Sequence, residues 1–256
     1  MENTVLIPCG QWNVPCRITE PDDGWIRRIV LGVHGLGGCS TDAIQCDIAA
    51  EMALFHGATF RFDFPGHGEN PNDNLCVEDC IQSLMAVARA AKERFPQVDD
   101  LCIFSTGFGA YVTLLALPQL QQLPGKIKLV VQTPNVQMHD TLLAMINISR
   151  ETFRVMEKIT FPLKRPLNVT YAFYEELLRH IALIPHNIPM LILQGEDDDY
   201  IRMSDIQQFR RINEKSKLVI IPGATHRFLE YGAWDMVLDL TRDWFEFEQV
   251  LLADWE

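Results

Sequence analysis

The sequence has neither an excess of basic residues nor a long apolar run. It contains 22 lysines and arginines against 34 aspartates and glutamates, which gives a net charge of −12. Nucleic acids and anionic membranes bind cationic surfaces, so this balance argues against both as partners. No apolar stretch approaches the ~20 residues that a membrane-spanning helix needs, and residues 1–8 lack the basic and apolar blocks of a signal peptide. We therefore expect a cytoplasmic protein without membrane insertion.

The cysteines show no disulfide or metal-binding pattern. There are seven, an odd number, and they are scattered along the chain, as is typical of reduced thiols in the cytoplasm. Cys76 and Cys80 are expected on one face of a helix, but no second pair of cysteines or histidines lies nearby at the spacing of metal ligands. We interpret both as small core residues and expect no metal site.

Apolar runs alternate with helical patterns along most of the chain. Strands are expected at residues 4–8, 14–19, 28–33, 58–62, 100–104, 128–132, 190–194 and 217–221, and helices at about 42–56, 77–94, 108–117 and 232–250. The first two strands would pair as a hairpin around Gly10. The rest of the alternation predicts a parallel sheet wrapped by helices, which is the α/β class.

Residues 136–186 interrupt this alternation. Helical patterns at about 138–157 and 170–182 flank the proline-containing stretch 161–166. An insertion of this size after a strand usually forms a lid over the strand ends. We therefore expect a core made of residues 1–135 and 187–256, with 136–186 as a helical cap. Several apolar residues of the cap could line an acyl pocket or form its own core: Met138, Leu142, Met145, Phe153, Met156, Phe161, Tyr171 and Phe173.

Residues 101–114 have the pattern of a nucleophile elbow from which the nucleophile is missing. An apolar run suited to a buried strand leads into the turn Ser105-Thr106-Gly107-Phe108-Gly109, and an apolar helical segment follows. An elbow needs small residues two positions before and after its centre, because larger side chains would clash in the strained strand-to-helix turn. The register that satisfies this requirement is centred on Gly107, which has no side chain to attack with.

Other motifs also stand where expected strands end, the edge at which open α/β sheets bind their ligands. They are His-Gly-Leu-Gly-Gly at 34–38, Asp-Phe-Pro-Gly-His-Gly at 63–68, Gly-Glu-Asp-Asp at 195–198 and Gly-Ala-Thr-His at 223–226. The glycines of the first motif, including Gly35 and Gly37, let the backbone turn sharply and direct N–H groups toward a substrate oxygen.

These four motifs, in this order around the elbow, resemble the α/β-hydrolase superfamily in its serine aminopeptidase or lysophospholipase-like branch. The resemblance covers nearly the whole chain. It implies the α/β-hydrolase fold: a mostly parallel central sheet with helices on both faces and a small helical lid inserted after a central strand. It also implies a serine hydrolase acting on esters, thioesters, amides or small peptides.

Carried over by position, the resemblance assigns roles to individual residues. Asp198 would orient His226 as general base, and the backbone N–H groups of Leu36 and Phe108 would form the oxyanion hole. The departure is Gly107, where the family has serine. Such chemistry implies no cofactor or metal, because acyl transfer needs only the triad and backbone donors. The expected partner is a small acyl or peptide-like substrate, and the expected state is a monomer or homodimer.

Several alternatives remain open at this stage. Ser105 could be the nucleophile in a shifted register, although Ile103 would then stand where the turn needs a small residue, and Thr106 and the thiol of Cys39 are weaker candidates. Asp197 and Asp199 compete with Asp198, which the Gly-x-x-Asp spacing favours. His34 and His67 read as loop scaffolding rather than catalysts.

The glycine at 107 itself allows three interpretations. The chain could be a hydrolase silenced by loss of its nucleophile. It could be a non-catalytic relative that binds a small ligand or partner. In the third, Asp198 and His226 would act as a dyad without a covalent intermediate.

Overall fold

The computed structural model describes the backbone of residues 2–253 and the side chains of residues 2–246. Its centre is an eight-stranded sheet with the strand order β1-β2-β4-β3-β5-β6-β9-β10. Six of the strands are mutually parallel: β3 (Arg28–Val33), β4 (Gly57–Phe62), β5 (Asp100–Thr106), β6 (Lys126–Gln132), β9 (Met190–Gly195) and β10 (Ser216–Ile221). The antiparallel hairpin β1 (Glu2–Cys9) and β2 (Trp12–Thr19) extends one edge, as the sequence predicts.

Helices cover both faces of the sheet, which explains why the central strands are apolar along their whole length. Every residue of β3, β4 and β9 is buried. One apolar cluster joins the sheet to α2 (Val77–Arg94), α3 (Gly107–Leu120) and α7 (Met203–Ile212). A second cluster joins it to α1 (Ala43–Leu54) and α8 (Ala233–Ala253). Neighbouring residues alternate between the clusters, because successive side chains of a strand point to opposite faces.

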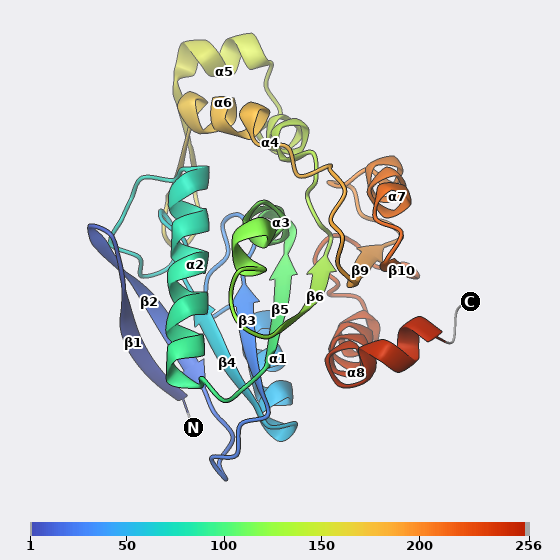
Figure 1. Cartoon of the computed structure of the whole chain (residues 1–256). Helices are drawn as coiled ribbons and strands as arrows, with labels where there is room; N and C mark the ends of the chain where they lie inside the picture. The colour runs from blue at the N-terminus through green and yellow to red at the C-terminus, as the bar shows by residue number, and fades with distance from the viewer. Residues whose placement is uncertain (1, 254–256) are drawn as a thin grey trace.

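Residues 136–186 lie between β6 and β9 in the chain and fold beyond the carboxyl ends of the strands, next to the arrowheads of β5 and β6 (Figure 1). They form α4 (Met138–Ile146), α5 (Arg150–Met156), the two-stranded sheet of β7 (Lys158–Phe161) and β8 (Leu167–Thr170), and α6 (Tyr171–Arg179). The predicted helix at 138–157 is two helices. Asn147 ends α4 in the left-handed conformation, and the Ser149 side chain begins α5 by accepting the N–H of Thr152.

The sequence did not predict three of the observed elements. α7 has ten residues and buries only Ile206 and Phe209, with Met203 and Ile212 partly buried. β7 and β8 have four residues each, too few for a clear alternation, and they flank the prolines that suggested irregular chain. In the described part of the chain no helix is long and apolar enough to cross a membrane, and no group of three acidic, histidine or cysteine side chains could hold a metal ion.

Candidate active site

The turn from β5 into α3 places Gly107 at the first position of the helix. Its φ is +49°, in the left-handed region that glycine adopts without strain. Gly109, two residues later, is required for a different reason: a Cβ there would collide with the backbone oxygens of Val33 and His34. The first turn of α3 therefore packs directly against the chain that follows β3. The elbow has the geometry that the sequence pattern predicts.

Ser105 lies within β5 and is not a nucleophile in a shifted register. Its side chain has no exposed surface, and its hydroxyl donates to the carbonyl oxygen of Val130 at 3.4 Å. A substrate cannot reach this hydroxyl without separating two central strands. Thr106, the residue before α3, is only partly buried and has extended backbone geometry.

A buried carboxylate and a partly exposed imidazole lie together beyond β9 and β10. His226 Nδ1 is 2.9 Å from Asp198 Oδ2, which also accepts the side-chain amide of Gln194 at 3.0 Å. The second oxygen, Asp198 Oδ1, accepts the backbone N–H groups of Tyr200 and Ile201 at 2.9 Å each. Burial raises the pKa of this carboxyl, but these hydrogen bonds and the charge of the imidazole more than offset it, and the pKa lies below its usual range.

The two neighbouring aspartates differ from Asp198 in their surroundings. Asp197 and Asp199 are exposed, whereas the side chain of Asp198 is only 1% exposed and contacts His226. The identical residue types at 197–199 could not distinguish these roles in the sequence. Gln194, which the sequence analysis missed, carries a visible signal: it is a polar residue at the end of an otherwise apolar strand.

The imidazole faces the elbow. A Cβ built on Gly107 would lie 4.0 Å from His226 Nε2, and among the described residues outside the first turn of α3 no other heavy atom lies within that distance. A hydroxyl oxygen, one bond farther out, could reach hydrogen-bond distance of this nitrogen. The structure thus brings together Gly107, His226 and Asp198 from three separate strand ends. The ring of Tyr200 contacts the imidazole edge-on, with the ring centres 5.2 Å apart.

His34 joins the loop after β3 to the loop after β4. Its Nε2 accepts the backbone N–H of Phe64 at 3.1 Å, so Nδ1 carries the proton and donates to the carbonyl oxygen of Gly35 at 2.8 Å. Burial lowers the pKa of this imidazole. It is therefore a neutral bridge between two loops, with no lone pair left for catalysis.

His67 makes a matching bridge in the opposite direction. Its Nε2 accepts the backbone N–H of Gly37 at 2.9 Å, and its Nδ1 donates to the carbonyl oxygen of Pro65 at 2.9 Å. Burial lowers the pKa of His67 to about 3, so the ring is neutral at physiological pH and keeps its acceptor nitrogen. Two neutral imidazoles thus fix the 34–38 loop against the 63–73 loop.

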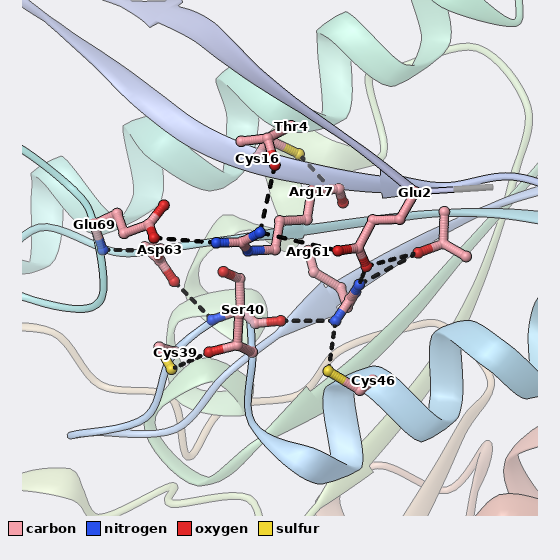
Figure 2. Close-up of polar contacts among 12 residues, drawn as sticks. Glu2, Thr4, Cys16, Arg17, Cys39, Ser40, Cys46, Arg61, Asp63 and Glu69 are labelled. Atoms are coloured by element: carbon pink, nitrogen blue, oxygen red, sulfur yellow. Dashed lines mark hydrogen bonds and ion pairs between the residues drawn. The ribbon is translucent and has the colours of Figure 1, made fainter. Parts of the chain in front are cut away.

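Asp63, the first residue after β4, binds backbone N–H groups just after the 34–38 loop and within the 63–73 loop, as Figure 2 shows. Its Oδ1 accepts the N–H of Ser40 at 2.6 Å, and its Oδ2 accepts the N–H of Glu69 at 2.9 Å. Arg17 of β2 pairs with the Glu69 carboxylate at 3.1 Å, also visible in Figure 2. Asp63 is nearly fully buried, and both of its oxygens are occupied by these loop contacts. Its role is structural.

The two backbone N–H groups predicted for the oxyanion hole belong to adjacent segments. Phe108 is the second residue of α3, where backbone N–H groups have no acceptor within the helix and the helix dipole favours negative charge. Leu36 belongs to the 34–38 loop, which approaches the elbow closely: a Cβ on Gly35 would lie 3.5 Å from the backbone oxygen of Thr106.

A cavity of about 280 Å³ lies between the loops described above, and neither the elbow residues 105–109 nor His226 line it. Its walls are the 34–38 and 63–73 loops, Arg17, and the β7–β8 turn, by which we mean residues 162–166. Cys39 also lines this cavity. Burial raises the pKa of its thiol, which contacts Thr41 and Asp42, so it is a protonated loop thiol rather than a nucleophile.

No known family model matches the sequence, and no curated protein is similar to it in sequence. The structure is nevertheless similar to solved hydrolases over almost its full length. Est1E from Butyrivibrio proteoclasticus, solved with ferulic acid bound, has a TM-score of 0.83 at 16% identity, with 96% of this chain and 99% of that chain covered.

Two further solved structures show the same similarity. For the mouse α/β hydrolase domain-containing protein 10, the TM-score is 0.75 at 13% identity, with 95% and 98% of the two chains covered. For a dienelactone hydrolase from Anabaena variabilis, the TM-score is 0.64 at 17% identity, with 96% and 97% covered. The chain therefore has the α/β-hydrolase fold that the sequence motifs predict.

Proposed function

We propose that this chain carries a serine-hydrolase-type site in which the nucleophile position is occupied by Gly107. The observation that carries the proposal is the placement of His226, whose Nε2 faces the Cβ position of residue 107 at 4.0 Å while its Nδ1 contacts Asp198. That is the relation of nucleophile, base and acid in a catalytic triad. The similarity to Est1E, solved with ferulic acid bound, and to a dienelactone hydrolase supports the assignment.

The proposed roles follow from the contacts. Asp198 fixes the tautomer and orientation of His226, and His226 would remove a proton from the attacking group. Leu36 and Phe108 would donate their backbone N–H groups to the developing oxyanion. With no side chain at 107, the chain cannot form an acyl-enzyme. Because loss of a triad nucleophile typically lowers turnover by about 10⁶, we expect the chain as it stands to be almost inactive.

The proposed substrates are small esters, thioesters, amides or peptides, as in the serine aminopeptidase or lysophospholipase-like branch. The 136–186 segment, which folds beyond the strand ends, would be the lid that selects among them. Each of the seven cysteines carries a free thiol, which supports the proposal of a reducing, cytoplasmic location. We propose a monomer or homodimer that needs no cofactor.

The test is to restore the nucleophile. We expect Gly107→Ser to hydrolyse p-nitrophenyl acetate and butyrate and to react with a fluorophosphonate probe, because its hydroxyl would lie within reach of His226. The unsubstituted chain should do neither. Adding His226→Ala should abolish the new activity, while adding Ser105→Ala should leave it unchanged, since Ser105 is buried in β5. A folded Gly107→Ser variant that neither turns over nor labels contradicts the proposal.

A second candidate rests on the open space above Gly107. A water molecule in that space could be activated by His226 for direct attack, without a covalent intermediate. This candidate predicts sustained hydrolysis by the unsubstituted chain that His226→Ala abolishes, measured over a panel of esters, amides and lactones. If neither the chain nor Gly107→Ser turns over, the space above Gly107 is instead a binding site, and thermal-shift screening would identify its ligand.

A further inference from the structure

One side chain of the β7–β8 turn binds the 63–73 loop through its backbone. Arg165 Nη1 donates to the carbonyl oxygens of His67 at 2.8 Å, Gly68 at 2.9 Å and Asn70 at 2.7 Å. Its Nη2 pairs with the carboxylate of Asp73. A guanidinium suits this task because it presents several donors in a rigid plane. A single residue of the 136–186 segment therefore binds the chain from His67 to Asp73.

The same turn contacts the 34–38 loop. A Cβ on Gly37 would lie 2.6 Å from Leu163 Cδ1, so the leucine side chain is seated directly on this glycine. Leu167, just beyond the turn, lies against Gly66 in the same way, at 3.3 Å from a Cβ built there. The β7–β8 turn thus touches both loops that the imidazole of His67 connects.

A continuous set of contacts runs from the turn to the proposed oxyanion hole. Arg165 binds the carbonyl oxygen of His67, the ring of His67 accepts the N–H of Gly37, and Gly37 follows Leu36 in the chain. We propose that Arg165 is a positioning residue that holds His67, and through it the 34–38 loop, in the conformation that directs the Leu36 N–H at substrate. The lid would thereby control the geometry of the oxyanion hole. This inference rests on the proposed function.

The protonation state of His67 supports the same coupling. The bond from Gly37 requires an unprotonated Nε2, and burial, together with the nearby charge of Arg165, lowers the pKa of the ring. Lys164 provides a natural comparison. It precedes Arg165 in the same turn and lines the same cavity, yet it is exposed and makes no hydrogen bond or ion pair with the residues that the structure describes.

The first test measures the Gly37 amide in the protein without any change at the elbow. We expect Arg165→Ala to speed hydrogen exchange of this amide by about tenfold or more, resolved by NMR, because its acceptor is no longer fixed. Lys164→Ala, the matched control, should leave the exchange rate unchanged. Faster exchange confined to residues 66–70 and 158–170, with the Gly37 amide unaffected, overturns the proposal and assigns Arg165 to the lid alone.

The second test is kinetic and uses the Gly107→Ser background. Removing one oxyanion donor typically lowers kcat by about 10²–10³, so a misplaced donor in Arg165→Ala should lower kcat at least tenfold with little change in KM. Millimolar guanidinium should restore part of the kcat that Arg165→Ala loses. Arg165→Lys, which has a single ammonium group, should have a lower kcat than Arg165→Ala with added guanidinium. A raised KM at unchanged kcat contradicts the positioning role. If Gly107→Ser is inactive, the proposed function fails, but the Gly37 exchange rate still decides the coupling.

Discussion

At the scale of single residues, two glycines of the elbow serve different physical purposes. Gly107 has a left-handed backbone but open space where a side chain would stand, whereas Gly109 has backbone oxygens in that space. A side chain at 107 would therefore be strained but not crowded. A side chain at 109 would push α3 away from the end of β3. The site tolerates a substitution at the first position and not at the second.

Alanine at each position separates these two effects. We expect Gly107→Ala to lower the free energy of unfolding by about 1–2 kcal/mol, the cost of a left-handed alanine. Gly109→Ala should cost about 3 kcal/mol, because the carbonyl oxygens of Val33 and His34 cannot move away. Urea unfolding at neutral pH measures both. Equal losses, or a larger loss at 107, would show that the elbow is less tightly packed against β3 than the structure indicates.

The sequence alone predicted site residues that belong to local patterns, and their catalytic roles stay a prediction. Gly107, Asp198 and His226 follow recognisable strand ends, and the structure places them together. Gln194 and Arg165 were missed, because their roles depend on contacts with residues far away in the chain. No spacing rule in one sequence reports that an arginine in one segment binds three carbonyl oxygens almost a hundred residues earlier.

At the scale of elements, burial decides how well the sequence predicts structure. The central strands were predicted to within a few residues, because strands covered on both faces are apolar throughout. α7 and the β7–β8 sheet were missed because each buries little of its surface. The predicted and observed elements differ most in the 136–186 segment, where one expected helix is two and a two-stranded sheet was not expected. The separation of this segment from the core remains a prediction.

Glu246 of helix α8 forms ion pairs with two arginines that differ in burial. Arg27 and Arg28 both contact Glu246, but the Arg28 side chain is 1% exposed and that of Arg27 is 56% exposed. Burial raises the pKa of the Glu246 carboxyl, yet the hydrogen bond and charge of Arg28 outweigh it and the pKa is lowered. The carboxylate is therefore charged inside the fold and depends on Arg28.

Removing each arginine in turn tests this difference. Arg28→Met should lower the free energy of unfolding by about 3–5 kcal/mol, because it leaves a buried charge without its main partner. Arg27→Met, at the exposed position, should cost less than about 1 kcal/mol. Adding Glu246→Leu to Arg28→Met should recover most of the loss, since the stranded charge is then gone. Urea unfolding of the four proteins is the measurement, and similar effects of both single variants would contradict the assignment.

At the scale of the whole molecule, three histidines with lowered pKa make the free energy of unfolding depend on pH. Burial lowers the pKa of His34, His67 and His186, so each binds a proton less readily in the folded chain than in the unfolded chain. Near and below about pH 6.5 the unfolded chain therefore binds more protons at these groups than the folded chain does. Their contribution to stability is thus complete above that pH and is lost as the pH falls.

His67 allows the size of this effect to be measured. Its pKa is lowered to about 3 in the folded chain, so below pH 6.5 only the unfolded chain binds this proton. The free energy of unfolding should therefore fall by nearly 1.4 kcal/mol for each pH unit, the slope for one proton. His67→Gln keeps an oxygen that can accept the Gly37 N–H but cannot be protonated in this range. We expect the fall in unfolding free energy between pH 7 and pH 5 to be smaller in this variant by about 1–2 kcal/mol. His139→Gln, at a partly exposed ring outside these two loops, is the control for the substitution itself. If His67→Gln shows the same slope as the unsubstituted chain, the ring takes up its proton in the folded state, and the Gly37 N–H then loses its acceptor within this pH range.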